Sequence, residues 1–160
     1  MSQLPKGLEM NLTTSLQPTL SLRPTVSGRA IDVIVADDEP ADNLLLALAA
    51  QDANAEMNFT FAEDGEELMQ ILTDRVASGN APDVVVLDIR MPRCTGLEAM
   101  ELISLSESLR RIPVVMFTTS RRTADMERGL SLGVTRFETK PSSYPELVAF
   151  ANELASVARG

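Results

Sequence analysis

Histidine is absent from this chain of 160 residues, and Cys94 is its only cysteine. The absence of histidine excludes Ser-His and Cys-His catalysis, a zinc site that depends on imidazole, and a histidine that donates a phosphoryl group. A single cysteine excludes a disulfide within the chain, which agrees with a reducing cytoplasm. No apolar run approaches the roughly 18 residues of a membrane-spanning helix, so we expect no membrane partner.

Basic residues are also few, because 14 lysines and arginines stand against 23 aspartates and glutamates, for a net charge of −9. Residues 1–29 hold three basic residues and one acid, a net charge of +2, so residues 30–160 carry −11. A protein that binds nucleic acid needs a basic face to contact phosphates, so we expect no nucleic-acid partner. An apolar content of 44% is ordinary for a soluble globular protein.

The chain divides into two regions by composition. Residues 1–29 contain three prolines, scattered serine and threonine, and no sustained hydrophobic period. This pattern predicts a flexible N-terminal arm. Residues 30–158 alternate between short apolar stretches and amphipathic segments, and their length suits one domain with one core.

The alternating region predicts five strands, each followed by a helix. The expected strands are residues 31–36, 57–62, 83–87, 112–119 and 134–139, and the expected helices are residues 40–53, 64–77, 96–106, 124–133 and 143–158. Short apolar strands between amphipathic helices indicate a parallel sheet with helices on both faces. We therefore expect an α/β fold, a doubly wound five-stranded parallel sheet. The run Leu44, Leu45 and Leu46 cannot face the core as a whole, so one leucine should be exposed, as a docking patch or a plain surface residue.

Polar residues end or directly follow every expected strand. They are Asp37 and Asp38 after the first strand, Glu63 and Asp64 after the second, Asp88 after the third, Thr118 and Thr119 at the end of the fourth, and Lys140 after the fifth. In an open parallel sheet, the carboxyl ends of the strands form the ligand-binding edge. We expect three aspartates, a hydroxyl and a lysine to meet there, whereas Glu63 and Asp64 fit better as caps of the second helix.

Clustered carboxylates repel unless a cation joins them, and Mg²⁺ suits oxygen ligands. A metal alone would need neither a lysine nor a threonine hydroxyl, but both groups suit the oxygens of a phosphoryl group. A carboxylate can also act as the nucleophile and form an aspartyl phosphate. The combination favours transfer of a phosphoryl group onto Asp88.

These residues resemble the receiver domains of two-component response regulators. The resemblance covers roughly residues 30–157 and rests on VADDEP, VVVLDIRMPRCTGLE, VVMFTT and RFETKP, in that order. Asp88 and Thr118 are 30 residues apart, and Thr118 and Lys140 are 22 apart, spacings similar to those of the family. The resemblance implies a flavodoxin-like fold with strand order 2-1-3-4-5.

The resemblance also implies a role for each matching residue. Asp88 would be the phosphoacceptor, and Asp38 a direct Mg²⁺ ligand with Asp37 as its partner. Asp88 and the backbone carbonyl of Arg90 would complete the metal ligands from the protein.

Four further roles are carried over from the family. Thr118 and Lys140 would bind the phosphoryl oxygens, and the Lys140–Pro141 bond would be cis. Thr118 and Phe137 would form the switch, which alters the surface near the fourth and fifth helices. Family members vary at the places of Arg90 and Ser120, and Thr119 is bulkier than the alanine or glycine often found there. Together these residues would shield the phosphoryl group, so slow self-dephosphorylation is expected.

The family implies a cytoplasmic signalling protein rather than an enzyme. Its phosphodonor would be a sensor histidine kinase or a histidine phosphotransfer protein, and it would signal to an unidentified downstream protein or relay the phosphoryl group. Only two residues follow Ala158, which favours a stand-alone receiver, and homodimer formation stays open. Two alternatives stay open as well: an aspartate-nucleophile phosphatase, which Arg90 disfavours because such enzymes usually have an acid there, and a receiver-like adaptor that is not phosphorylated.

Overall fold

The computed structural model describes residues 29–160, and residues 31–160 form one compact unit. The predicted arm, residues 1–29, lies outside the described residues except for Arg29, so its flexibility remains a prediction. The same holds for the domain boundaries predicted at residues 30 and 158.

Five strands form one parallel sheet in the order β2-β1-β3-β4-β5. The strands are β1 (Ile31–Ala36), β2 (Met57–Ala62), β3 (Val84–Leu87), β4 (Val114–Thr118) and β5 (Arg136–Thr139). The predicted doubly wound sheet and its strand order are both confirmed. β1 and β3 are neighbours, which brings the residues after these two strands to one place at the edge of the sheet.

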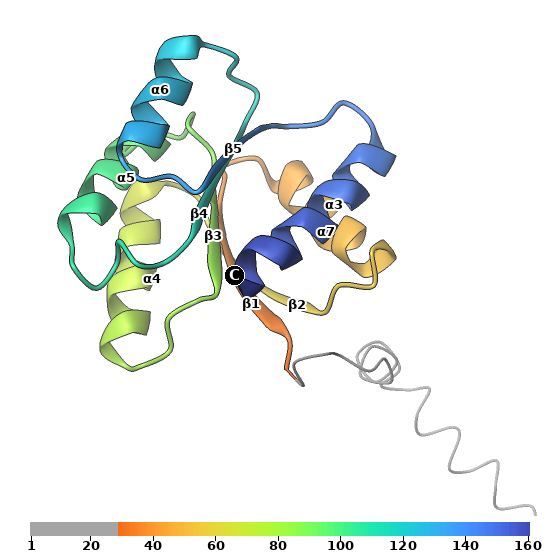
Figure 1. Ribbon diagram of the computed structural model, residues 1–160, viewed down its shortest axis with the longest axis horizontal. Helices are drawn as coiled ribbons and strands as arrows, with labels where there is room; N and C mark the ends of the chain where they lie inside the picture. Colours follow the sequence, from red (N-terminus) through yellow and green to blue (C-terminus); the bar gives the residue numbers. More distant parts are fainter. Residues whose placement is uncertain (1–28) are drawn as a thin grey trace, which may run out of the picture. The chain divides into compact units, whose positions relative to one another are not determined.

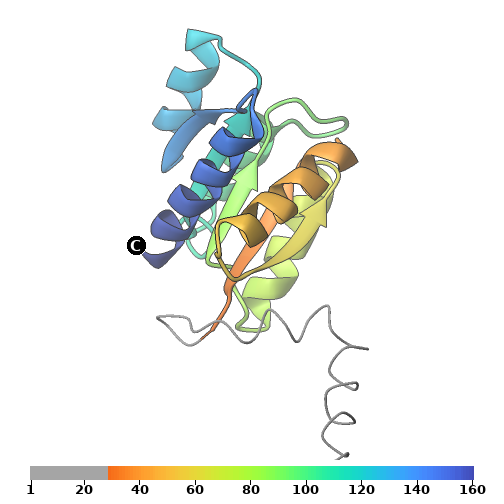
Figure 2. The same ribbon diagram turned by 90° about the vertical axis from the view of Figure 1, so that its right-hand side faces the viewer.

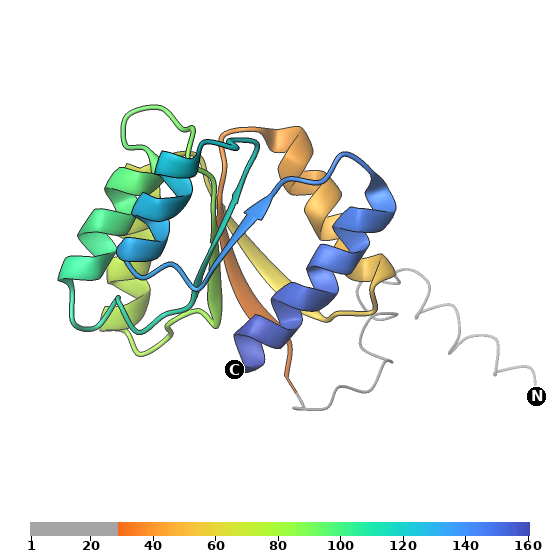
Figure 3. The same cartoon turned by 45° about the horizontal axis from the view of Figure 1, so that its top comes forward.

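Helices cover both faces of the sheet (Figure 1). They are α3 (Pro40–Asp52), α4 (Gly65–Ala77), α5 (Gly96–Leu105), α6 (Thr123–Ser131) and α7 (Tyr144–Arg159). Viewed along the sheet, α4, α5 and α6 lie on one side and α3 and α7 on the other (Figure 3). Figure 2 shows α3 and α7 side by side in front of the sheet. This arrangement places both faces of the sheet out of water, as the apolar strands require.

The side chains of each strand alternate between two core clusters. Ile34, Leu87 and Met116 belong to the cluster beneath α4, α5 and α6. Val33 and Phe117 belong to the cluster beneath α3 and α7. Strands that are buried on both faces need apolar residues at every position, which explains the unbroken run Val84–Leu87.

Local sequence signals set the helix ends. Asp64 caps α4, where its side chain accepts a hydrogen bond from the backbone N–H of Glu67 at 2.8 Å, as predicted. Thr95 and Glu98 form a reciprocal capping box at the start of α5. Glu39 provides no side-chain cap for α3, which instead has proline in its first turn.

The leucine run on α3 differs from the prediction. Leu46 is buried, but Leu44 and Leu45 are both exposed, by 61% and 43%, so two of the three leucines face outward rather than one. The reason is that α3 packs on the sheet and on α7 through a stripe that leaves the opposite side open. Within residues 29–160, no helix is both long and apolar enough to cross a membrane.

Candidate functional site

Asp88 lies directly after β3, at the edge where the strands end. Its backbone N–H donates to the carbonyl of Ala36 at 3.0 Å, so the β1 pairing continues up to the site. The residue is 7% exposed, and its Oδ1 lies 3.4 Å from the backbone nitrogen of Arg90. A buried carboxylate at this position is not a helix cap, because Thr95 caps the helix that follows.

Asp88 lies in a cluster with two other aspartates, Asp37 and Asp38. One carboxylate oxygen each from Asp37, Asp38 and Asp88 lies within 4.8 Å of the other two. Asp37 is 4% exposed and accepts a hydrogen bond from the backbone N–H of Glu39 at 2.9 Å, whereas Asp38 is exposed. A set made only of oxygen ligands, partly open to water, suits a hard divalent cation such as Mg²⁺ or Mn²⁺.

Lys140 directly follows the carboxyl end of β5, and its side chain reaches this cluster. Its Nζ lies 2.6 Å from Oδ2 of Asp37, 2.8 Å from Oδ2 of Asp42 and 3.1 Å from Oδ2 of Asp88. It also lies 6.0 Å from the centre of the Phe117 ring, within the range of a cation–π contact. Lys140 therefore neutralises part of the negative charge of the cluster.

Burial and charge act on the cluster in opposite directions. Burial raises the pKa of Asp37 above its ordinary value, although hydrogen bonds from Lys140 and from the backbone of Glu39 oppose this effect. Burial lowers the pKa of Lys140, but the hydrogen bonds and charges of the neighbouring aspartates outweigh it, so this pKa is raised. Lys140 is therefore a permanent cation at neutral pH.

The predicted cis bond before Pro141 is wrong. No peptide bond of the described residues is cis, so Lys140–Pro141 is trans. The trans form is favoured by roughly 0.5–1 kcal/mol for bonds before proline. In this structure it already allows the Lys140 ammonium group to contact three carboxylates, so the contacts of Lys140 do not require the cis form.

Thr118 ends β4 and is fully buried. Its Oγ1 accepts a hydrogen bond from the backbone N–H of Ser120 at 3.2 Å, and its carbonyl accepts one from the backbone N–H of Lys140 at 2.8 Å. Ser120 is also buried and donates to Asp125 of α6 at 2.6 Å. The two predicted phosphoryl-binding residues are thus linked through the backbone, and the loop after β4 is tied to α6.

Phe137 lies half-buried on β5, where its register partner is Met116. It packs on the core cluster beneath α4, α5 and α6. A Cβ atom added to Gly129 of α6 would lie 3.6 Å from its ring, so Phe137 fits closely against the buried side of α6. The residue therefore connects the sheet with α6, as a switch residue would have to.

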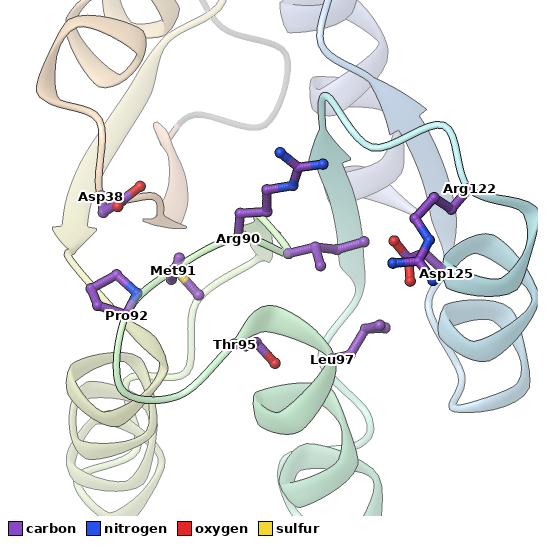
Figure 4. A pocket seen from close by; sticks show the side chains of 9 residues that line it. Asp38, Arg90, Met91, Pro92, Thr95, Leu97, Arg122 and Asp125 are labelled. Atoms are coloured by element: carbon purple, nitrogen blue, oxygen red, sulfur yellow. The ribbon is translucent and has the colours of Figure 1, made fainter.

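An open depression of about 560 Å³ lies beside the cluster. Figure 4 shows side chains of its lining that come from the loops after three different strands: Asp38 after β1, Arg90 after β3 and Arg122 after β4. Arg90 is exposed, so its side chain is available to a ligand or partner that enters this depression.

Asp42 is the site residue that the sequence reasoning missed. It lies in the first turn of α3 and contacts Lys140 across a sequence separation of 98 residues. The sequence places Asp42 in the first turn of the expected helix, close to the edge where the aspartates gather, but gives no sign of its contact with Lys140. The acid looked like an ordinary first-turn residue that favours the helix dipole.

Comparisons with known proteins agree with this geometry. Residues 33–152 match the family described as the response regulator receiver domain. The chain is 30% identical over 123 residues to the probable methanogenesis regulatory protein FilR2 of Methanothrix harundinacea, a match that covers 76% of this chain and 79% of the relative. It spans about half the length of transcriptional regulators that it also matches, such as 48% of TcrX of Mycobacterium tuberculosis.

Solved structures of response regulators are similar as well. The phosphorylated cyanobacterial phytochrome response regulator RcpA is 25% identical, with a TM-score of 0.74, over 82% of this chain and 96% of that one. The Mn²⁺-bound form of response regulator Rcp1 is 25% identical, with a TM-score of 0.68, over 79% and 92%. The chain belongs to the response regulator receiver domain family of two-component systems.

Proposed function

We propose that Asp88 accepts a phosphoryl group in a reaction that depends on Mg²⁺, and that this modification switches the surface formed by α6, β5 and α7. The observation that carries the proposal is the position of Asp88, buried at the end of β3 within reach of Lys140 Nζ at 3.1 Å and of two further aspartates. Two solved relatives add support, because the structure of RcpA is that of the phosphorylated protein and the structure of Rcp1 is that of an Mn²⁺-bound form.

The proposed step is a substitution at phosphorus. A carboxylate oxygen of Asp88 forms the new bond to phosphorus, and the bond from phosphorus to the donor nitrogen or oxygen breaks, with its electron pair leaving on the donor. Lys140 stabilises negative charge on the phosphoryl oxygens, and Thr118 turns to donate its hydroxyl to one of them.

Asp37, Asp38, Asp88 and the backbone carbonyl of Arg90 are the proposed holders of the cation. A bound divalent cation would neutralise charge that develops on the phosphoryl oxygens. Mg²⁺ is proposed because this ion typically keeps several waters and uses only a few carboxylates.

The proposed readout begins at Thr118. When its hydroxyl turns toward the phosphoryl group, Phe137 moves inward, and α6 and β5 shift with it. Arg121 and Arg122 are exposed at the start of α6, so this shift changes the positions of two positive charges that a partner could contact. The partner on the input side would be a sensor histidine kinase or a histidine phosphotransfer protein in the cytoplasm; the output would go to a downstream protein or, by relay, to a further histidine.

The hydrolase alternative is disfavoured, because Arg90 occupies the place two residues after Asp88 where such phosphatases have a second acid. The adaptor alternative is disfavoured because Asp37, Asp38, Thr118 and Lys140 are all present.

Incubation with acetyl phosphate and Mg²⁺, followed by intact mass, tests the proposal. We expect one phosphoryl adduct that requires Mg²⁺ and is lost in Asp88→Asn. The matched control is Asp74→Asn, which removes an exposed carboxylate of α4 that accepts from Gln70. We expect the adduct to decay slowly, because Arg90 and Thr119 lie beside the site. A folded protein without an adduct would support the adaptor, and steady phosphate release without an adduct would support the hydrolase.

A further inference from the structure

Asp42 differs from the other carboxylates that contact Lys140. Asp37 and Asp88 belong to the cluster of three aspartates that could hold a cation, and Asp42 does not. Its Oδ2 nevertheless accepts a hydrogen bond from Lys140 Nζ at 2.8 Å, shorter than the 3.1 Å contact to Asp88. Asp42 thus contacts the ammonium group of Lys140 but does not belong to the proposed metal site.

A lysine ammonium group has three N–H donors, and here each one has a carboxylate. A phosphoryl group on Asp88 takes over the contact that Lys140 now makes to Asp88, which is the longest of the three. A cation bound at the cluster would use Asp37 as a ligand and so compete for its contact with Lys140. The contact to Asp42 is the one that neither event removes.

We propose that Asp42 is a positioning residue that holds the Lys140 ammonium group in place while the cation binds and the phosphoryl group is transferred. The role rests on the proposed function of Asp88. It follows from the geometry of α3, which begins at the same edge of the sheet and carries Asp42 in its first turn.

Lys140 has room to move if this contact is lost. A cavity of about 70 Å³ lies beside it, lined by Asp42, Leu45, Phe117, Lys140, Pro141 and Leu147. A free lysine side chain gains rotamer entropy, so it leaves a weakly held position readily. The contact with Asp42 keeps Lys140 from leaving its position. The side chain of Asp42 is 39% exposed, so water screens this ion pair in part.

The chain has only two lysines, Lys6 and Lys140, which makes the contact directly observable. In a Lys6→Arg background, ¹³C-labelled lysine gives one set of side-chain NMR signals. We expect the two ε-protons of Lys140 to be inequivalent, with slow side-chain motion, in the parent protein without metal. In Asp42→Asn they should merge and the side chain should become mobile. Unchanged signals would overturn the proposed role.

The matched control is Asp52→Asn. Asp52 lies in the last turn of the same helix and accepts a hydrogen bond from Tyr144 of α7 at 2.6 Å, so this variant also removes one carboxylate that ties α3 to α7. We expect it to leave the Lys140 signals unchanged. A change of the same size in both variants would assign the effect to the α3–α7 packing and overturn the role of Asp42.

The rate of adduct formation with acetyl phosphate supplies the second measurement. We expect Asp42→Asn to slow it about three- to tenfold, the size of one charge-assisted hydrogen bond reduced by solvent screening, and Asp52→Asn to leave it unchanged. Equal rates in the parent and in Asp42→Asn would overturn the role of Asp42 alone. No adduct in the parent protein would instead overturn the proposed function, whatever the NMR signals show.

Discussion

Gly96 lies against the backbone of Asp88, in the first position of α5. A Cβ atom at Gly96 would lie 2.1 Å from the carbonyl oxygen of Asp88, which is far inside van der Waals contact. The backbone N–H of Gly96 also donates to the carbonyl of Ile89 at 2.9 Å. Glycine is therefore required here by the close approach of two backbone segments, and it fixes where Asp88, the proposed phosphoacceptor, lies.

Gly96→Ala should displace Asp88 and destabilise the domain. We expect a loss of at least about 1–3 kcal/mol in the free energy of unfolding, as for an overpacked core, because the contact is with backbone that cannot rotate away. Urea denaturation measures this loss, and adduct formation at temperatures where the variant is folded measures the displacement. A variant with the parent's stability and rate would contradict the close contact.

Lys140→Met tests the charge balance of the site. Removal of the Lys140 ammonium group leaves Asp37, Asp42 and Asp88 without the positive charge that they share. Loss of one partner of a buried ion pair typically lowers the free energy of unfolding by about 3–5 kcal/mol. Burial already raises the pKa of Asp37, and repulsion by the other aspartates should raise it further in the variant.

This variant should show a distinct pH dependence. A carboxyl group whose pKa is higher in the folded state binds its proton more tightly when folded, so stability rises as pH falls toward that pKa. The cost of Lys140→Met should therefore be smaller at pH 5 than at pH 7, by about 1.4 kcal/mol for each unit by which the carboxyl pKa of the folded variant exceeds the lower of these two pH values. Urea denaturation at both pH values measures this difference, and an equal cost at both would show that no carboxyl pKa has risen into the range between them.

Helices α3, α4 and α6 end in the same local pattern, with a left-handed residue after the last turn. These residues are Asn54, Gly79 and Gly133, with φ of 58°, 80° and 104°. After α6, the N–H of Gly133 bonds the carbonyl of Leu130, and the N–H of Val134 bonds that of Gly129, which is a Schellman motif. The predicted helix end at Gly133 is confirmed, and its conformation explains why glycine is there.

Two glycines of this region should respond to alanine with opposite signs. Gly129 lies inside α6, and an added Cβ would meet its neighbours at 3.6–3.8 Å, an ordinary contact distance. Gly129→Ala should raise stability by about 0.5–1 kcal/mol through helix propensity. Gly133→Ala should lower it by about 1–2 kcal/mol, because alanine disfavours a left-handed backbone. Thermal or urea unfolding of both variants gives the two signs, and a loss of stability in Gly129→Ala would show that Phe137 tolerates no added volume there.

For the domain as a whole, cation binding should appear as added stability. A ligand that binds only the folded state stabilises it by mass action, so a Kd of about 1 mM and about 10 mM Mg²⁺ give about 1.4 kcal/mol. We expect this increase in the free energy of unfolding in the parent protein and its loss in Asp38→Asn. Asp74→Asn should keep the full increase, and an equal increase in all three proteins would place the cation elsewhere.

The sequence determined those features that depend on neighbours along the chain. Short apolar runs predicted the strands, and apolar residues at helical spacing predicted the helices, between residues 31 and 159 to within a few residues. The strands are apolar throughout because both faces of the sheet are buried. It also predicted that polar residues follow each strand, and hence a common edge. Asp64 as a cap and Gly133 as a helix end belong to the same class, because their causes lie within one helical turn.

Tertiary structure decided what depends on residues far apart in the chain. The contact between Asp42 and Lys140 depends on how α3 and β5 meet across the sheet, and no spacing in the sequence encodes it. The trans bond before Pro141 and the exposure of both Leu44 and Leu45 likewise depend on the packing of neighbouring elements. A local sequence pattern shows which face of a helix or strand is apolar. Which other element packs on that face depends on the crossover connections that assemble the sheet.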